Sequence, residues 1–310
     1  MNKFSIGIFS GIFSGISWGL NTVIIGVILS STILTFNSKN LFTSTLVVAF
    51  LHDFISALWL SLNLIRTQKI KKLLVILKKR SIIFLICGSI LGGPIGMASY
   101  LLGVKYIGPS YTACISSLYP VLGTLLTAIF FKEKINKNIK TGVFLCVIGI
   151  ILLSYVPINF EIYPNYKLGI LFSIICVLGW AAECVIAAYA MKYGEIDSDI
   201  AICIRQITSF IFYSLLIIPI IKGYGVVLFI VNTKLIIILI LTSLIGSLSY
   251  LFWYKSIDTI GAPRGMCLNI TYIIWTVLFE ILFFKMNIDL RIIISSLVVF
   301  LGIVLVLKKK

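Results

Sequence analysis

The stretch FSIGIFSGIFSGISWGLNTVIIGVIL occupies residues 4–29 and contains no charged side chain. A helix needs roughly 20 mainly apolar residues to cross a bilayer. The stretch is longer than the apolar core of a signal peptide and lacks a small-residue cleavage pattern. We therefore expect residues 4–29 to form the first membrane-spanning helix.

The rest of the chain has the same character. Of its 310 residues, 60% are hydrophobic and 12% are charged, and the mean hydropathy is +1.14. Soluble domains are about half apolar and about a quarter charged, so this composition excludes a soluble enzyme. Glycines, prolines and basic clusters separate ten apolar runs, and we expect an all-α membrane protein with ten spans: 4–29, 44–65, 82–103, 109–131, 139–156, 167–191, 198–221, 235–256, 262–284 and 290–307.

The formal net charge of +16 would suggest a nucleic-acid partner in a soluble protein. Here most Lys and Arg residues lie in alternate connections between apolar runs, such as residues 66–80 and 132–140. Such connections remain in the cytoplasm. We therefore expect both termini in the cytoplasm, a lipid bilayer around the chain, and no nucleic-acid partner.

The seven cysteines all lie inside apolar runs without paired CxxC spacing, and the chain has one histidine. We expect neither disulfides nor a metal site, and no cofactor. The glycines of the segment GGPIG at residues 92–96 are not preceded by a strand, so we expect close helix packing and a bend there rather than a phosphate loop.

The sequence also repeats itself. At one constant offset Gly7, Trp18 and Ile24 match Gly169, Trp180 and Ile186, and at a second offset the matches include Gly93, Ile107, Tyr119 and Gly149 with Gly246, Ile260, Tyr272 and Gly302. The halves 1–157 and 158–310 then hold five spans each. Because five is odd, the second half enters the membrane from the opposite side. Such inverted repeats are typical of secondary transporters, whose substrate binds near the midplane.

Few ionisable side chains lie within the predicted spans. An ionisable side chain at the bilayer centre costs about 2.5 to 3.5 kcal/mol, so each is a functional candidate: His52, Asp53, Glu183, Arg205 and Glu280. Glu280 is near a helix end, so its carboxylate either reaches water at the membrane surface or takes part in function. Arg205 and His52 occupy matched repeat positions. Either Asp53 or Glu183 neutralises Arg205 in a structural polar cluster, or the His52/Asp53 pair carries a coupled proton.

Polar and aromatic side chains form stripes on several predicted helices. Trp180 and Glu183 share one helix face, and their repeat partners are Trp18 and Asn21. Further stripes comprise Ser116, Tyr119 and Gly123; Ser243, Ser247, Tyr250 and Tyr254; and Asn269, Tyr272 and Thr276. We interpret Trp59, Trp253 and Tyr155 as anchors at the membrane interface.

These residue types favour one kind of substrate. Aromatic faces bind a quaternary ammonium with roughly 2 kcal/mol per desolvated contact, and a nearby carboxylate offsets its charge. An anionic substrate would need inward-facing basic side chains, and only Arg205 lies well inside a predicted span rather than at its end. The stripes therefore favour a small cation or zwitterion.

Several segments resemble the EamA-type permeases of the drug/metabolite transporter superfamily, and more nearly the LicB-type bacterial choline permeases. The resembling segments include SGISWGL (14–20), HDF (52–54), GGPIGM (92–97), KEKI (132–135), GWAAE (179–183), IRQITSF (204–210) and LNITYIIWTVLF (268–279).

The resemblance implies a 5+5 inverted-topology repeat that works by alternating access in the bacterial cytoplasmic membrane. It also implies a choline cage walled by Trp18, Trp180, Tyr250 and Tyr272, with Glu183 as counter-charge and Asn269 as polar support. Tyr119 and Asn21 are further candidates for substrate binding. Proton coupling or gating is assigned to His52, Asp53, Glu183 or Arg205.

We thus expect uptake of choline or a close quaternary amine, driven by the membrane potential and coupled to protons. Two alternatives remain open. One is an EamA-type exporter of amino acids, drugs or other small metabolites. The other is a membrane-embedded transferase or hydrolase, which would require a catalytic cluster. The sequence offers no nucleophile–base pair and no cluster of metal ligands, so we do not expect an enzyme.

Overall fold

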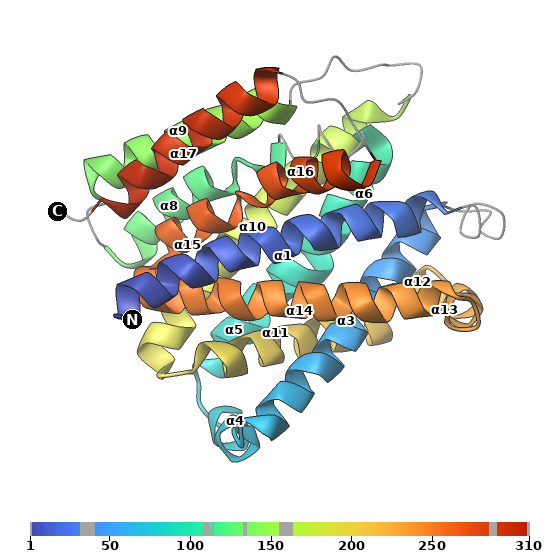
Figure 1. The fold of residues 1–310 in the computed structure, drawn as a ribbon. Helices are drawn as coiled ribbons and strands as arrows, with labels where there is room; N and C mark the ends of the chain where they lie inside the picture. Colours follow the sequence, from blue (N-terminus) through green and yellow to red (C-terminus); the bar gives the residue numbers. More distant parts are fainter. Residues whose placement is uncertain are drawn as a thin grey trace.

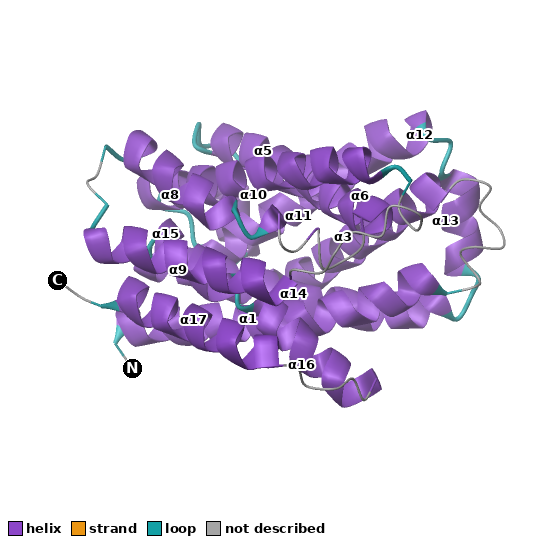
Figure 2. Cartoon of the chain, turned by 90° about the horizontal axis from the view of Figure 1, so that it is seen from above, coloured by secondary structure: helices purple, strands orange, loops and turns teal. Residues whose placement is uncertain are grey.

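The computed structural model of the chain describes residues 2–31, 41–107, 112, 115–132, 135–154, 164–284 and 290–308. Its regular structure is helical, and no strand occurs in these ranges. The helices form one bundle (Figures 1 and 2). Their bounds are α1 Lys3–Ser30, α3 Leu41–Arg66, α4 Ile70–Ile76, α5 Ile82–Ile90, the π-helix η1 Leu91–Met97, α6 Ala98–Ile107, α8 Tyr119–Phe130, α9 Lys137–Ser154, α10 Tyr166–Gly194, α11 Ser198–Phe212, the π-helix η2 Tyr213–Ile217, α12 Ile218–Ile220, α13 Tyr224–Val231, α14 Leu235–Ile260, α15 Ala262–Asn269, α16 Tyr272–Phe284 and α17 Leu290–Leu307.

Seven helical stretches within the described residues are long and apolar enough to cross a membrane. They fall in the first, second, third, sixth, seventh, eighth and ninth expected runs: Lys3–Leu29, Phe42–Arg66, Ile82–Ile107, Tyr166–Gly194, Ser198–Ile220, Leu235–Ile260 and Ala262–Phe283. Shorter apolar helices lie in the fourth and tenth runs, and α9 lies in the fifth. The prediction of an all-helical, multi-pass membrane protein is confirmed, while the ten-span topology stays a prediction.

The helices differ from the expected runs in three places. The short helices α4 and α13 lie between the predicted spans, where no helix was expected. The ninth run is divided into α15 and α16 by residues 270–271. Between the eighth and ninth runs the chain turns at Gly261. Its φ of 85° is a backbone conformation that glycine adopts without steric strain. Pro263 follows in the first turn of α15, where its missing N–H removes no helical hydrogen bond.

Two long helix pairs pack in a matched way. α1 packs along α14, and α10 packs along α5, η1 and α6. A Cβ added to Gly7 would lie 2.5 Å from Ile260 Cγ2, and one added to Gly169 would lie 2.4 Å from Ile107 Cγ2. Glycine therefore permits close backbone approach in both pairs. Gly7 matches Gly169 and Ile107 matches Ile260 in the sequence repeat, so the two contacts join equivalent positions.

The distribution of polarity is that of a protein in lipid. Large apolar side chains are exposed on the outside, with Leu215 at 75% and Ile129 at 69%. Asp53, Glu183 and Arg205 are instead at most 1% exposed. Charged side chains that face the bundle interior and pair with one another are typical of functional sites in membrane proteins.

One end of the bundle carries a cluster of ion pairs. Lys69 Nζ lies 2.6 Å from Asp199 Oδ2, and Lys72 Nζ lies 2.8 Å from Asp197 Oδ1, so the start of α4 is tied to the start of α11. Burial alone would lower the pKa of Lys69, but Asp199 and Asp197 outweigh it and raise that pKa. Burial alone would raise the pKa of Asp197, but Lys72 and Lys69 hold it below its usual value. The start of α1 and the end of α17 lie together at one end of the bundle (Figures 1 and 2).

Candidate functional site

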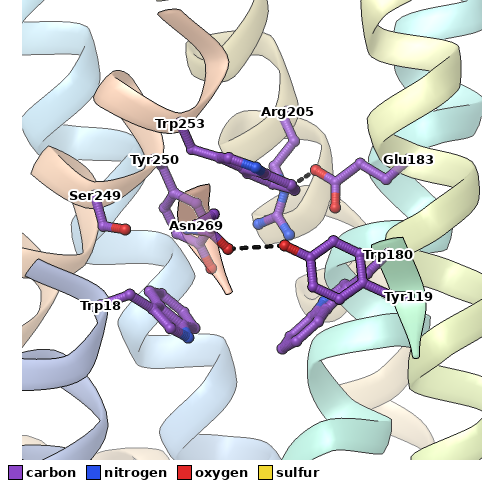
Figure 3. A pocket seen from close by; sticks show the side chains of 9 residues that line it. All are labelled: Trp18, Tyr119, Trp180, Glu183, Arg205, Ser249, Tyr250, Trp253 and Asn269. Atoms are coloured by element: carbon purple, nitrogen blue, oxygen red, sulfur yellow. Dashed lines mark hydrogen bonds and ion pairs between the residues drawn. The ribbon is translucent and has the colours of Figure 1, made fainter. Parts of the chain in front are cut away.

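A small cavity lies in the bundle interior, where six helices meet (Figure 3). Its volume is about 20 Å³, which is room for about one water molecule. In this structure the cavity is therefore smaller than an organic cation. Its walls come from α1, α8, α10, α11, α14 and α15, through Trp18, Tyr119, Trp180, Glu183, Arg205, Ser249, Tyr250, Trp253 and Asn269.

Aromatic rings from both halves of the chain line the cavity. The ring centroids of Trp18 and Tyr250 are 5.2 Å apart, and those of Tyr119 and Trp180 are 5.9 Å apart at an interplanar angle of 84°. Tyr100 packs behind Trp180 with centroids 5.0 Å apart. Figure 3 shows the two indoles of Trp18 and Trp180 on opposite sides of the same space. Both indoles line this cavity, and their role in binding a substrate stays a prediction.

A buried guanidinium joins the two carboxylates. Arg205 Nε donates to Glu183 Oε1 at 2.8 Å, and Arg205 Nη1 lies 3.7 Å from Asp53 Oδ2. Arg205 also lies over the ring of Tyr250, with Cζ 4.9 Å from the centroid. The hydroxyl of Tyr254 donates to Glu183 Oε1 at 2.9 Å, whereas Glu183 Oε2 has no hydrogen-bond partner among the described residues. Glu183 is thus half of an ion pair with Arg205, as one of the two alternatives from the sequence had it.

Polar side chains continue the cluster away from the cavity. His52 Nε2 lies 3.3 Å from Asn21 Oδ1, and His52 Nδ1 lies 3.4 Å from Asp53 Oδ1. The hydroxyl of Ser209 donates to Asp53 Oδ2 at 2.5 Å. Gln206 Nε2 lies 3.5 Å from Asp53 Oδ1, and its Oε1 accepts from Arg205. The structure therefore joins the four residues assigned to proton coupling or gating into one network. The network thus contains two carboxyl groups, one guanidinium and one imidazole.

A second polar contact closes the opposite wall. Tyr119 donates its hydroxyl to Asn269 Oδ1 at 3.0 Å, and Asn269 Nδ2 donates to Ser14 Oγ at 2.9 Å. Ser14 and Ser249 hydroxyls are 3.2 Å apart. Asn269 is held by α1, α8 and α14 in this way, and its role as a polar support for a substrate stays a prediction.

The glycines of the third run make room for the site. η1 is a π-helix that contains Pro94, and π-helical turns are common at functional sites. A Cβ on Gly92 would lie 1.5 Å from Glu183 Oε2, one on Gly93 2.5 Å from Ser209 Oγ, and one on Gly96 2.8 Å from Trp180 Cδ1. The expectation of close packing is met, and the packing partners are the site residues themselves.

Two predicted binding residues do not line the cavity. Asn21 is buried and pairs with His52, and Tyr272 is buried at the start of α16. Trp253 was interpreted as an interface anchor, and that interpretation is wrong: it is 6% exposed and lines the cavity. Its spacing of three residues from Tyr250 placed it on the same helix face and was the available clue. Trp59 does lie nearer the surface, and Tyr155 is outside the described residues.

A wider hollow lies farther along the same helices. It has a volume of about 360 Å³, and its lining includes Phe131, Lys192, Asp258 and Arg264. Met266 of α15 is buried nearby: its carbonyl accepts a hydrogen bond from Tyr119, which lines the cavity, and its sulfur would lie 2.4 Å from a Cβ on Gly123. The hollow and the cavity share several of their helices, since residues of α8, α10, α14 and α15 line the cavity and residues of the same helices line the hollow.

Comparisons with known proteins agree with this architecture. The model of the EamA-like transporter family matches residues 5–155 and again residues 167–308. Protein LicB of Haemophilus influenzae is 34% identical over 230 residues, which cover 71% of this chain and 74% of that protein. A crystal structure with a TM-score of 0.66 and 14% identity covers 98% of this chain and 96% of its own, and it supports the fold.

Proposed function

The chain belongs to the EamA-like transporter family, and from this premise we propose that it takes up choline or a close quaternary amine across the bacterial cytoplasmic membrane. Members of this family are transporters rather than enzymes. The observation that carries the choice of substrate is the cavity itself. Indole and phenol rings from both halves converge there beside the carboxyl group of Glu183.

The proposal includes ten spans in a 5+5 inverted repeat, divided at residues 157 and 158, with both termini in the cytoplasm. The family model matches the chain twice, once in each proposed half. Positions that are equivalent in the two halves also touch one another: Cys146 Sγ lies 3.6 Å from the carbonyl of Val299, and Asp53 lies 3.5 Å from Gln206. Such contacts are expected on a twofold pseudo-axis. The matched contacts of Gly7 and Gly169 support the same arrangement.

In this proposal the aromatic faces bind the ammonium group and Glu183 supplies the negative charge. A desolvated cation–π contact stabilises binding by about 2 kcal/mol. The binding walls are Trp18, Trp180, Tyr250, Tyr119 and Trp253, and Asn269 is their polar support. Asn21 and Tyr272 support these walls from behind.

Alternating access would open the cavity to one side at a time. The wider hollow is the proposed passage on the side of Lys192 and Arg264, which carry positive charge. The lining of this hollow has two basic side chains and one acidic side chain, Asp258, so its net positive charge favours release of a cation. The basic residues of this end also make it the cytoplasmic side under the positive-inside rule.

The membrane potential suffices as a driving force. An inward-moving monocation gains about 2.3 kcal/mol per 100 mV, so about 150 mV supports accumulation of a few hundredfold. Proton coupling through His52, Asp53, Glu183 or Arg205 would add to this gradient. The shared network of these four residues supports such coupling.

Uptake of labelled choline into proteoliposomes tests the proposal. A potential and a pH gradient would be imposed separately, and we expect a negative interior to drive uptake that excess unlabelled choline abolishes. Glu183→Gln should lose this uptake, whereas Glu280→Gln should retain it because Glu280 is half-buried on α16, away from the cavity. Efflux of amino acids without choline uptake would instead establish the exporter alternative.

A further inference from the structure

We propose that Arg205 is a tethered cation that occupies the substrate's place in the empty transporter, and that substrate binding moves its guanidinium from Glu183 to Asp53. This inference rests on the proposed function, because it takes the substrate to be an organic cation. It concerns a step that the family resemblance does not supply, namely what fills the aromatic site before the substrate arrives.

The first support is the position of the guanidinium. Arg205 Cζ lies 4.9 Å from the centroid of the Tyr250 ring, and that ring packs against Trp18 in the cavity wall. An ammonium substrate would bind at the same distance from such a ring. The aromatic face proposed for the substrate is therefore already taken by a cation of the protein (Figure 3).

The second support is the partner of that cation. Arg205 Nε bonds Glu183 Oε1 at 2.8 Å, and Glu183 is the carboxylate that lines the cavity. The remaining cavity volume of about 20 Å³ is too small for a trimethylammonium group. Substrate entry thus requires a side chain to leave, and Arg205 already holds both the ring and the carboxylate that the substrate needs.

The third support is a second carboxylate that can receive the guanidinium. Asp53 Oδ2 lies 3.7 Å from Arg205 Nη1 and does not line the cavity. Gln206 already accepts a hydrogen bond from the same nitrogen. A small rotation of the side chain would exchange a strong bond to Glu183 for a strong bond to Asp53. The guanidinium would then have a carboxylate partner throughout the exchange. This matters because a buried charge without a partner costs several kcal/mol.

The number of buried carboxylates matches the number of cations in the proposed substrate-bound state. With Arg205 on Asp53 and a monovalent cation on Glu183, each buried carboxylate has one positive partner. Without substrate, one guanidinium is shared between both. The switch therefore rejects neutral molecules, because only a cation can replace Arg205 at Glu183.

Choline binding to purified protein tests the switch through a pair of variants. The double variant Asp53→Asn/Arg205→Met removes one negative and one positive charge, so the net charge of the cluster stays as it is in the wild type. It leaves Glu183 and Tyr250 without their tethered cation. We expect it to bind choline at least about tenfold more tightly than the wild type. Asp53→Asn alone leaves Arg205 with Glu183 as its one carboxylate, and we expect at least about tenfold weaker binding.

The outcomes separate the two levels of inference. If the wild type binds no quaternary amine at all, the proposed function and the switch both fall. If the wild type binds choline and the double variant binds it no more tightly, the switch alone is wrong. Lys234→Gln, an exposed charge far from the cluster in sequence, serves as a control that should bind like the wild type.

A wild-type structure with choline bound tests the same switch if the double variant does not fold. We expect the guanidinium of Arg205 to have left the ring of Tyr250 and to bond Asp53 with both terminal nitrogens. A guanidinium that stays over Tyr250 and on Glu183 while choline occupies the cavity would overturn the proposal.

Discussion

Replacing Gly92 by alanine should disrupt the site through a single methyl group. The added Cβ would lie 1.5 Å from Glu183 Oε2 and 2.1 Å from Cδ, so methyl and carboxylate cannot occupy the same space. The Glu183 side chain would have to turn away. It would then lose its bonds from Arg205 Nε and from the hydroxyl of Tyr254, which are 2.8 and 2.9 Å long.

The magnitude follows from two opposed effects. Alanine is favoured over glycine within a helix by up to about 1 kcal/mol. Breaking a buried ion pair costs about 3 to 5 kcal/mol, because the remaining charge is left without a partner. The loss is larger, so we expect a net destabilisation of about 2 to 4 kcal/mol. Choline binding should fall with it, since the displaced carboxylate is the proposed counter-charge.

Thermal unfolding in detergent and choline titration measure both effects on the same sample. Gly26→Ala is the matched control, because nothing lies within 4 Å of a Cβ at Gly26. That variant should unfold at the wild-type temperature or slightly above it. A Gly92→Ala protein with wild-type melting temperature and wild-type choline affinity would refute both the position of the carboxylate and its role.

Three other changes have expected results. Trp180→Leu should weaken choline binding by at least about tenfold while the protein stays folded, and unchanged affinity in a binding assay would remove the indole from the site. Tyr119→Phe removes the bond to Asn269 Oδ1, so it should lower the free energy of unfolding by about 1 kcal/mol; a thermal shift near zero would contradict this. Asp197→Asn should lower that free energy by less than about 1 kcal/mol at neutral pH and low salt. Because the pKa of Asp197 is lowered in the folded protein, its contribution is present above the usual carboxyl pKa and is lost as the pH falls through the lowered value. The difference from the wild type should therefore vanish in acid and shrink in high salt.

Much of the site was predictable because it depends on helical periodicity and on the high energy of buried charge. Trp18 and Trp180 lie mid-helix at matched positions, and the few ionisable residues in the spans had to meet inside the bundle. The pairing of Arg205 with both Glu183 and Asp53 confirms the structural-cluster interpretation in its geometry. Whether the same residues also move a proton stays a prediction.

Other features depend on helix phase and side-chain rotation, which a linear pattern does not encode. Trp253 was assigned to the interface because indoles are common there, yet the phase of α14 turns it inward. The position of the Arg205 guanidinium over Tyr250 depends on several side-chain torsions. The π-helical winding of η1 depends on what packs against its glycines, and no local sequence preference specifies those partners.

The winding of η1 fixes the rotational register of everything that follows it in the third run. A π-helical turn holds more residues than an α-helical turn, and an α-helix advances about 100° per residue. If Leu91–Met97 rewound as an ordinary α-helix with all its residues kept, α6 would therefore swing by about that angle. Tyr100 would then leave the ring of Trp180, 5.0 Å away, and face a neighbouring helix or lipid. The π-helical winding of η1 is thus what keeps Tyr100 against Trp180, and its loss should be far more damaging than a conservative replacement of any single side chain.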